Sequence, residues 1–101
     1  MMLRHIVVMT WTRPLSDDEL AEVGQSLDQL RAQAGSIRAL EHGPDLGIRG
    51  AGADYALTID FDDADGWRSY SDHPAHRVPR AVLAKYVASQ MVIQIPLSEG
   101  T

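Results

Sequence analysis

The chain has 101 residues, 45% of them hydrophobic and 23% charged, with a formal net charge of -5 at pH 7. This length fits one domain spanning residues 1–101, because two smaller domains would each bury too little apolar surface. The acidic balance argues against a nucleic-acid partner, since phosphate binding needs a clustered basic surface. The lack of cysteine excludes disulfides and thiolate chemistry.

The hydropathy and the N-terminal residues predict a cytoplasmic protein with no membrane contact. No apolar run approaches the roughly 18 residues of a membrane span. Residues 1–5 lack the charged-then-apolar pattern of a secretory signal.

The first half of the chain predicts a strand, a helix and a hairpin. Residues 3–12 are rich in apolar and β-branched types, and both faces of this strand are apolar near its middle, which predicts burial on both sides. Ser16 and Glu19 have the spacing of a capping box, so a helix of about 18 residues should begin there and end with a left-handed glycine at Gly35.

Two further strands should follow as a hairpin. Residues 37–46 predict a weaker strand, and Gly43-Pro44 indicates either a sheet edge or an irregular strand end, because proline cannot donate to a ladder. Three glycines in residues 47–52 indicate a mobile loop. Residues 54–62 then alternate cleanly between apolar and polar side chains, which predicts a half-buried strand.

The second helical region is interrupted by proline. A short helix carrying Trp67 and Tyr70 is capped by Asp63 or Asp65 and stops at residues 73–74, because proline opens a helix but disrupts its interior.

Helical structure should resume after the break and run to about Ala88. Pro79 suggests that residues 74–79 form a loop or one turn, with the regular helix starting near Pro79. Residues 91–95 predict the last strand, which Pro96 ends. The apolar stripe of this helix is expected to consist of Val78, Val82, Leu83 and Tyr86.

The order β-α-β-β-α-β predicts an α+β, ferredoxin-like fold, with two helices on one face of a four-stranded antiparallel sheet. The other sheet face would stay uncovered and apolar, and a monomer rarely exposes so large an apolar patch. A homodimer through the open sheet face, forming a dimeric α/β barrel, is therefore expected.

Residues 70–76, Tyr-Ser-Asp-His-Pro-Ala-His, hold two of the four histidines in the chain. Histidine exchanges protons near neutral pH, and a tyrosine hydroxyl can donate a hydrogen bond to a developing oxyanion. Across an apolar cavity, such a pair can remove a proton next to a carbonyl and hold the enolate. This chemistry suits aldol-type ring closure of a poly-ketone chain.

The Tyr-x-x-His-Pro-x-His motif resembles the stress-responsive A/B barrel (Dabb) family, whose members are small dimeric α+β barrels. Residues 3–8 match the start of the family pattern, with a basic residue, a histidine and an apolar strand, and residues 91–95 match its last strand. The resemblance covers roughly the whole chain.

This family includes a plant cyclase that closes a linear tetraketide into an aromatic acid without metal or cofactor. The resemblance implies that His76 is a general base, and that His5 and Tyr70 orient it or bind the substrate carbonyl. Leu27 stands at or near the position of a further pocket tyrosine in that cyclase, so one polar contact is missing.

Three more residues, His73, Trp67 and Tyr55, are predicted to bind a small apolar or phenolic ligand, and His42 and Asp72 are lesser candidates. No cofactor is expected.

Each of these residues also has a structural interpretation. His5 can be hydrogen-bonded inside the barrel, His73 can satisfy a helix end, and Tyr70 and Trp67 can be core residues. Zinc binding by His73 and His76 with His5 is disfavoured because Pro74 disrupts the helical geometry.

Three classes of function stay open on the sequence. The first is a cofactor-free cyclase or isomerase acting on a polyketide-like or aromatic substrate. The second is a non-catalytic stress-responsive or structural dimeric barrel. The third is a monooxygenase-like or haem-handling barrel.

Overall fold

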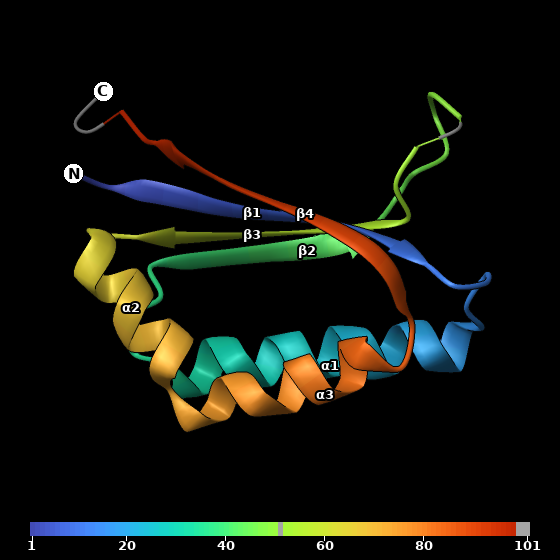
Figure 1. Cartoon of the computed structure of the whole chain (residues 1–101), viewed down its shortest axis with the longest axis horizontal. Coiled ribbons are helices and arrows are strands. Elements are labelled where there is room, and N and C mark those ends of the chain that lie inside the picture. Colours follow the sequence, from blue (N-terminus) through green and yellow to red (C-terminus); the bar gives the residue numbers. More distant parts are fainter. Residues whose placement is uncertain (51, 99–101) are drawn as a thin grey trace.

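The computed structural model describes residues 1–50 and 52–98 of the chain. Strands and helices follow one another in the expected order, and the second helical region is divided at residues 73–74 as predicted (Figure 1). The elements are β1 (Leu3–Trp11), α1 (Asp17–Gln33), β2 (Ala39–Pro44), β3 (Tyr55–Phe61), α2 (Ala64–Asp72), the short 3-10 helix η1 (Pro74–His76), α3 (Arg77–Ala84) and β4 (Val87–Pro96).

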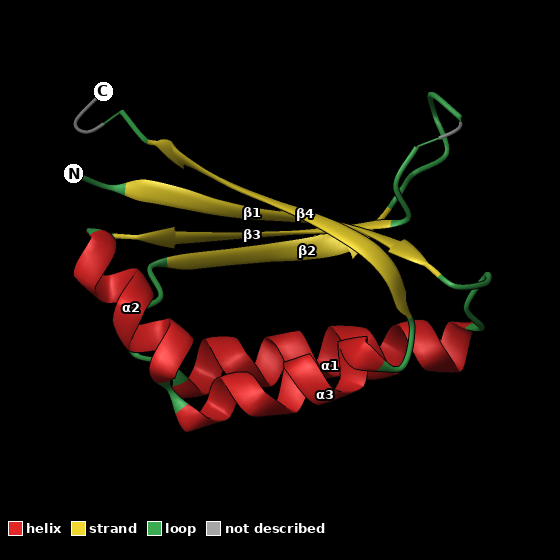
Figure 2. Cartoon of the chain, in the orientation of Figure 1, coloured by secondary structure: helices red, strands yellow, loops and turns green. Residues whose placement is uncertain are grey.

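The four strands form one antiparallel sheet in the order β2-β3-β1-β4, and the helices cover a single face of it (Figure 2). This arrangement confirms the predicted ferredoxin-like α+β fold. The hairpin of β2 and β3 and the edge position of β2 are confirmed as well. β1 is central, and its residue His5 lies opposite Ile59 of β3 and Gln94 of β4.

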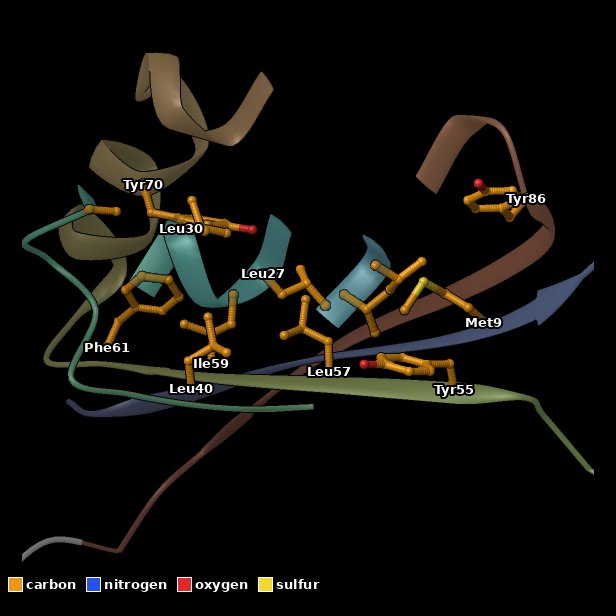
Figure 3. Close-up of a cluster of buried hydrophobic side chains, with 13 residues drawn as sticks. Met9, Leu27, Leu30, Leu40, Tyr55, Leu57, Ile59, Phe61, Tyr70 and Tyr86 are labelled. Carbon is orange, nitrogen blue, oxygen red and sulfur yellow. The ribbon is translucent and has the colours of Figure 1, made fainter. Parts of the chain in front are cut away.

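The hydrophobic core lies between the sheet and the helices (Figure 3). Because successive strand residues point to opposite faces, the alternating residues Leu57, Ile59 and Phe61 of β3 are buried, as the pattern predicts. Leu27 and Leu30 of α1 meet them from the helical layer, and each is 1% exposed. His5 is paired with the buried Ile59, so its side chain lies on the same, helix-covered face of the sheet.

The opposite face of the sheet is open and apolar. Ile6 and Val8 of β1 lie on this face, and directly paired residues point to the same side, so Ile93 and Met91 of β4 lie there too. Met91 is 76% exposed and Ile93 is 59% exposed. Within one chain, the prediction that β1 is buried on both sides therefore holds for the helix-covered face alone.

The first helix has the predicted capping box. Ser16 Oγ accepts from the Glu19 N–H, and the Glu19 carboxylate accepts from the Ser16 N–H at 2.9 Å. The predicted left-handed stop at Gly35 is wrong. The helix ends at Gln33 with Ala34 in an extended conformation, whose N–H still donates to the Leu30 carbonyl, and Gly35 is not among the positive-φ glycines of the described residues.

The second helical region differs from its prediction at both ends of α3. Pro79 does not delay the helix, because it falls in the first turn, where no backbone N–H has a partner to lose. The helix ends at Ala84 rather than near Ala88, and β4 already begins at Val87. Val78 is half exposed and does not belong to the buried stripe, whereas Pro79 is buried.

The loop between β2 and β3 carries two glycines with positive φ, Gly47 and Gly50, both at 75°. Asp45 accepts from the Gly47 N–H at 3.0 Å and so fixes the start of the turn. The predicted loop of residues 47–52 includes Ala51, which lies outside the described residues.

No helix within the described part of the chain is long and apolar enough to cross a membrane. The cytoplasmic location stays a prediction from the sequence.

Candidate functional site

The break after α2 places a histidine beside the sheet. Pro74 opens η1, and the side chain of His73 caps it, with its Nδ1 accepting from the Ala75 N–H at 3.0 Å. The turn brings His76 against the ring of Tyr70, with 4.5 Å between the two ring centroids. The proline in the motif therefore acts by redirecting the chain, and this turn positions His76.

His5, Tyr70 and His76 line a common cavity of about 310 Å³ between the sheet and the helices. They come from β1, α2 and η1. The sequence predicts that these residues converge, although His5 and His76 are 71 positions apart. The remaining wall is mostly apolar, with a few polar side chains. It is formed by Val7, Leu27, Leu30, Leu57, Ser71, Pro79, Arg80, Leu83, Gln90 and Val92.

Tyr70 is buried, and its ring also packs against Phe61 at 5.3 Å between centroids. Burial raises the pKa of Tyr70 to about 12, and the nearby charge of Arg80 opposes this shift. Its hydroxyl forms no hydrogen bond with any described residue. At neutral pH, Tyr70 is thus a protonated donor that lines a cavity and has no acceptor in the described part of the chain.

Burial lowers the pKa of His76 below 6.5, and the charge of Arg80 lowers it further, whereas the Ser71 main chain raises it. The His76 ring is therefore mainly neutral at pH 7. Its Nδ1 is sealed inside the protein and has no hydrogen-bond partner among the described residues. Any proton that passes between this ring and a ligand must move through Nε2.

His5 is 8% exposed, and its pKa is lowered by burial first and then by the charge that His76 would carry. Gln94 of β4 lies directly opposite and places its amide Nε2 3.0 Å from His5 Nδ1. An amide nitrogen can only donate, so Nδ1 accepts and the neutral ring carries its proton on Nε2. Gln94 thereby sets both the tautomer and the orientation of His5.

The three predicted binding residues do not line this cavity. His73 is the cap of η1, and its ring nitrogen is already used there. Trp67 packs beside His5, with 6.3 Å between ring centroids. Tyr55 lies elsewhere, next to Trp11 and His42.

A second histidine cluster, formed by Asp28, His42 and Tyr55, lies between α1 and the hairpin. His42 Nδ1 is 2.7 Å from Tyr55 Oη, and His42 Nε2 is 2.7 Å from Asp28 Oδ1. Burial raises the pKa of Tyr55, and the charge of Asp28 adds to this effect. Both ring nitrogens of His42 have partners, so this cluster joins elements together and offers no free group to a ligand.

Sequence reasoning missed Gln94 and Arg80 as site residues. The signal for Gln94 is its place in the last strand, but only the register of β1 against β4 puts it opposite His5. Leu27, noted for its position in the first helix, does line the cavity. Across residues 1–50 and 52–98, no three His, Asp or Glu side chains come together as a metal-binding group.

The sequence matches the model of a known family. The family model of the stress responsive A/B barrel domain, Dabb, matches residues 3–96, so this chain belongs to the Dabb family. No curated protein matches the chain, and the closer likeness to the plant cyclase stays a prediction.

Solved structures show the same architecture. A dimeric ferredoxin-like protein of unknown function from Thermobifida fusca is 33% identical, with a TM-score of 0.88, and the match covers 96% of this chain and 92% of that one. A Dabb family protein from Mesorhizobium loti is 20% identical, with a TM-score of 0.78 and coverage of 96% and 98%. A hydroxynitrile lyase from Passiflora edulis is 18% identical, with a TM-score of 0.82 and coverage of 99% and 96%.

Proposed function

We propose that this protein is a cofactor-independent enzyme of the cyclase or isomerase class, acting on a polyketide-like or aromatic carbonyl compound. The observation that carries the proposal is the meeting of His5, Tyr70 and His76 in one cavity, whose walls include both polar and apolar side chains. Such cavities, with a few convergent polar groups of shifted pKa, are typical of active sites.

The proposed first step is proton removal from the carbon next to a carbonyl. Nε2 of His76 takes the proton, the C–H electron pair forms the enolate double bond, and the carbonyl π pair moves to oxygen. Tyr70 donates a hydrogen bond to that oxygen as its charge develops. Its raised pKa keeps the hydroxyl proton in place throughout neutral pH.

In ring closure, the enolate carbon then attacks a second carbonyl, whose π pair moves to oxygen and gives an alkoxide. In isomerisation, the His76 imidazolium instead returns the proton to a different carbon of a conjugated enolate, while the enolate oxygen pair re-forms the carbonyl. In ring closure, the His76 imidazolium returns its proton to the new alkoxide, which leaves the enzyme unchanged. His5, which carries its proton on Nε2, is placed to hydrogen-bond the second oxygen. The apolar parts of the wall fold the chain of the substrate.

The Passiflora edulis protein offers limited support, because its identity to this chain shows the fold alone. Its name assigns it lyase action on hydroxynitriles, so an enzyme has been described on this fold. The non-catalytic alternative has no comparable observation in its favour.

Deuterium exchange tests this proposal directly. We would incubate the protein in D₂O with aromatic methyl ketones such as 4-phenyl-2-butanone and follow loss of the α-proton signals by NMR. The wild-type protein should accelerate exchange, and His76→Gln should lower the rate by a factor on the order of 10² or more. His42→Gln is the matched control and should keep the wild-type rate.

Exchange no faster than in buffer would contradict catalysis and favour the non-catalytic barrel. Equal loss in His76→Gln and His42→Gln would show that the effect comes from folding instead of from the cavity.

We also propose that the chain forms a homodimer through the open sheet face. The Thermobifida fusca relative is described as dimeric. The open face carries Met91 and Ile93, and a hollow of about 440 Å³ beside it is lined by exposed apolar loop residues such as Leu46 and Ile48. A face of this kind is typical of an interface between protein chains.

Light scattering after size-exclusion chromatography measures the assembly. Ile93→Asp should yield monomers, because the partner would have to bury an unpaired carboxylate. Val78→Asp places the same charge on the helix-covered side and should leave the dimer intact. A wild-type monomer at micromolar concentration would refute the homodimer.

A further inference from the structure

Arg80 of α3 lies on the wall of the cavity that holds His5, Tyr70 and His76. It shares this wall with Pro79 and Leu83 of the same helix. Arg80 is exposed overall, so this residue borders both the cavity and solvent. The proposed active site therefore has a cation at its mouth.

This cation is unpaired within the described part of the chain. Arg80 forms no ion pair or hydrogen bond with any other described residue. Most cationic side chains elsewhere do, although the chain is acidic and holds only nine of them. The pairs are Arg4 with Asp60, Arg13 with Glu19, Arg38 with Asp62, Arg68 with Asp65, and Lys85 with Glu22.

The charge of Arg80 also acts on the reacting groups. It lowers the pKa of both Tyr70 and His76, so it lies within electrostatic reach of them. The positive charge of Arg80 would therefore also attract an anionic group of a ligand that contacts Tyr70 and His76. Apolar side chains such as Leu27 and Leu57 line the rest of the cavity and suit an uncharged ligand body.

We propose that the cavity takes a small organic carboxylate, with the carboxylate at Arg80 and the apolar body against the leucines. This inference rests on the proposed function and names its substrate class. One guanidinium presents a planar fork that matches one carboxylate in two parallel hydrogen bonds. The reacting carbonyl of the same molecule would then lie between Tyr70 and His76.

Matched acid and amide ligands test this inference by calorimetry. We would use 3-phenylpropanoate and 3-phenylpropanamide, which share shape and differ in charge. The wild-type protein should bind the acid about fivefold more tightly than the amide, as expected for a partly exposed charge pair. In Arg80→Gln this preference should vanish, while amide binding stays unchanged.

Two further variants make the test specific. Arg80→Lys keeps the charge but loses the fork, so part of the preference should remain. Arg77→Gln removes the same charge three positions earlier on the same helix, at a residue that forms no ion pair and does not line the cavity. It should keep the full preference for the acid.

Equal binding of acid and amide by the wild-type protein would overturn the inference, as would binding of neither. A loss of preference in Arg77→Gln as large as in Arg80→Gln would also overturn it, because net charge alone would then explain the result. These outcomes are separate from the exchange assay with a neutral ketone, which tests the acid–base proposal without a carboxylate.

Discussion

The molecule contains two histidine clusters that differ in how their polar atoms are satisfied. In the Asp28–His42–Tyr55 cluster, both ring nitrogens of His42 have partners at 2.7 Å. In the cavity, His76 Nδ1 has no partner among the described residues, and the Tyr70 hydroxyl has none either. Both clusters contain a histidine and a tyrosine, and the sequence alone does not show which of their polar atoms have hydrogen-bond partners.

The difference shows how a structural histidine is told from a candidate catalytic one. A buried polar group without a partner destabilises the fold, so its presence calls for another explanation. His42 stabilises the contact of α1 with the hairpin, because each of its hydrogen bonds crosses between elements. Tyr70 instead presents a hydroxyl without a partner among the described residues next to a cavity, and His76 lines the same cavity without a hydrogen bond to another described side chain.

The largest expected effect is on catalysis. Tyr70→Phe removes the proposed donor to the enolate oxygen, and loss of one such donor lowers rates by about 10²-fold. The free energy of unfolding should change little, because the Tyr70 hydroxyl has no protein partner to lose within the described residues. Ketone exchange rates and urea unfolding of the same sample measure both quantities. An unchanged rate would remove Tyr70 from the mechanism.

The opposite result is expected at the other tyrosine. Tyr55→Phe leaves His42 Nδ1 without its partner, so the free energy of unfolding should fall by about 1–3 kcal/mol. The exchange rate should stay at the wild-type value, because Tyr55 does not line the cavity. Urea unfolding is the measurement, and a loss of rate in folded Tyr55→Phe would break the distinction between the clusters.

Between pH 7 and pH 5, the pH dependence of stability should come from the cavity histidines. The pKa of His5 and of His76 is lowered from 6.5, so below that pH the unfolded chain binds more protons than the folded one. The free energy of unfolding should therefore be highest above pH 6.5 and should decrease as the pH falls below that value. The double variant His5→Gln, His76→Gln should show a shallower decline in unfolding curves at pH 7 and pH 5. An identical decline would place the cause in other groups.

A smaller effect is expected from Gln94, which acts through His5. Gln94→Leu removes the hydrogen bond that fixes the His5 tautomer, so the exchange rate should drop only a few-fold, on the order of 1 kcal/mol. Gln94→Asn places the amide on a shorter side chain and is the matched control for polarity. NMR of the imidazole nitrogens should show a tautomer mixture at His5 in Gln94→Leu. A single unchanged tautomer would show that Gln94 does not position the ring.

The smallest effect is expected at Gly24 in α1. A Cβ there would lie 3.5 Å from His42 Cε1 and 3.9 Å from Tyr55 Oη, both ordinary contacts. Gly24→Ala should therefore raise the free energy of unfolding by about 0.5–1 kcal/mol through helix propensity. Thermal unfolding measures this change. A loss of stability would mean that the Asp28–His42–Tyr55 cluster needs the empty space.

Much of the fold could be predicted because local rules and tertiary packing agree. The alternation in residues 54–62 follows the two faces of one strand, and the Ser16–Glu19 spacing defines a helix start by itself. Pro79 and Gly35 misled the prediction. Proline is generally unfavourable inside a helix, but Pro79 lies in the first turn of α3, which tolerates it. Glycine generally favours a left-handed helix end, but α1 ends with Ala34 in an extended conformation.

The residues that line the candidate cavity were predictable where the motif itself includes them. Tyr70 and His76 are close in sequence, and His5 follows from the family pattern at the first strand. Gln94 and Arg80 could not be found in this way, because their places depend on strand register and on the packing of α3. His73 and His76 look alike in the sequence, and only the geometry of η1 makes one a cap and the other a cavity residue.

One NMR titration tests the central distinction most directly. The imidazole signals of His5, His42, His73 and His76 would be followed while 4-phenyl-2-butanone is added to the wild-type protein. We predict that the signals of His5 and His76 shift together with one dissociation constant, while those of His42 stay in place. Shifts at His42 alone, or at none of the four, would contradict a ligand site formed by His5, Tyr70 and His76.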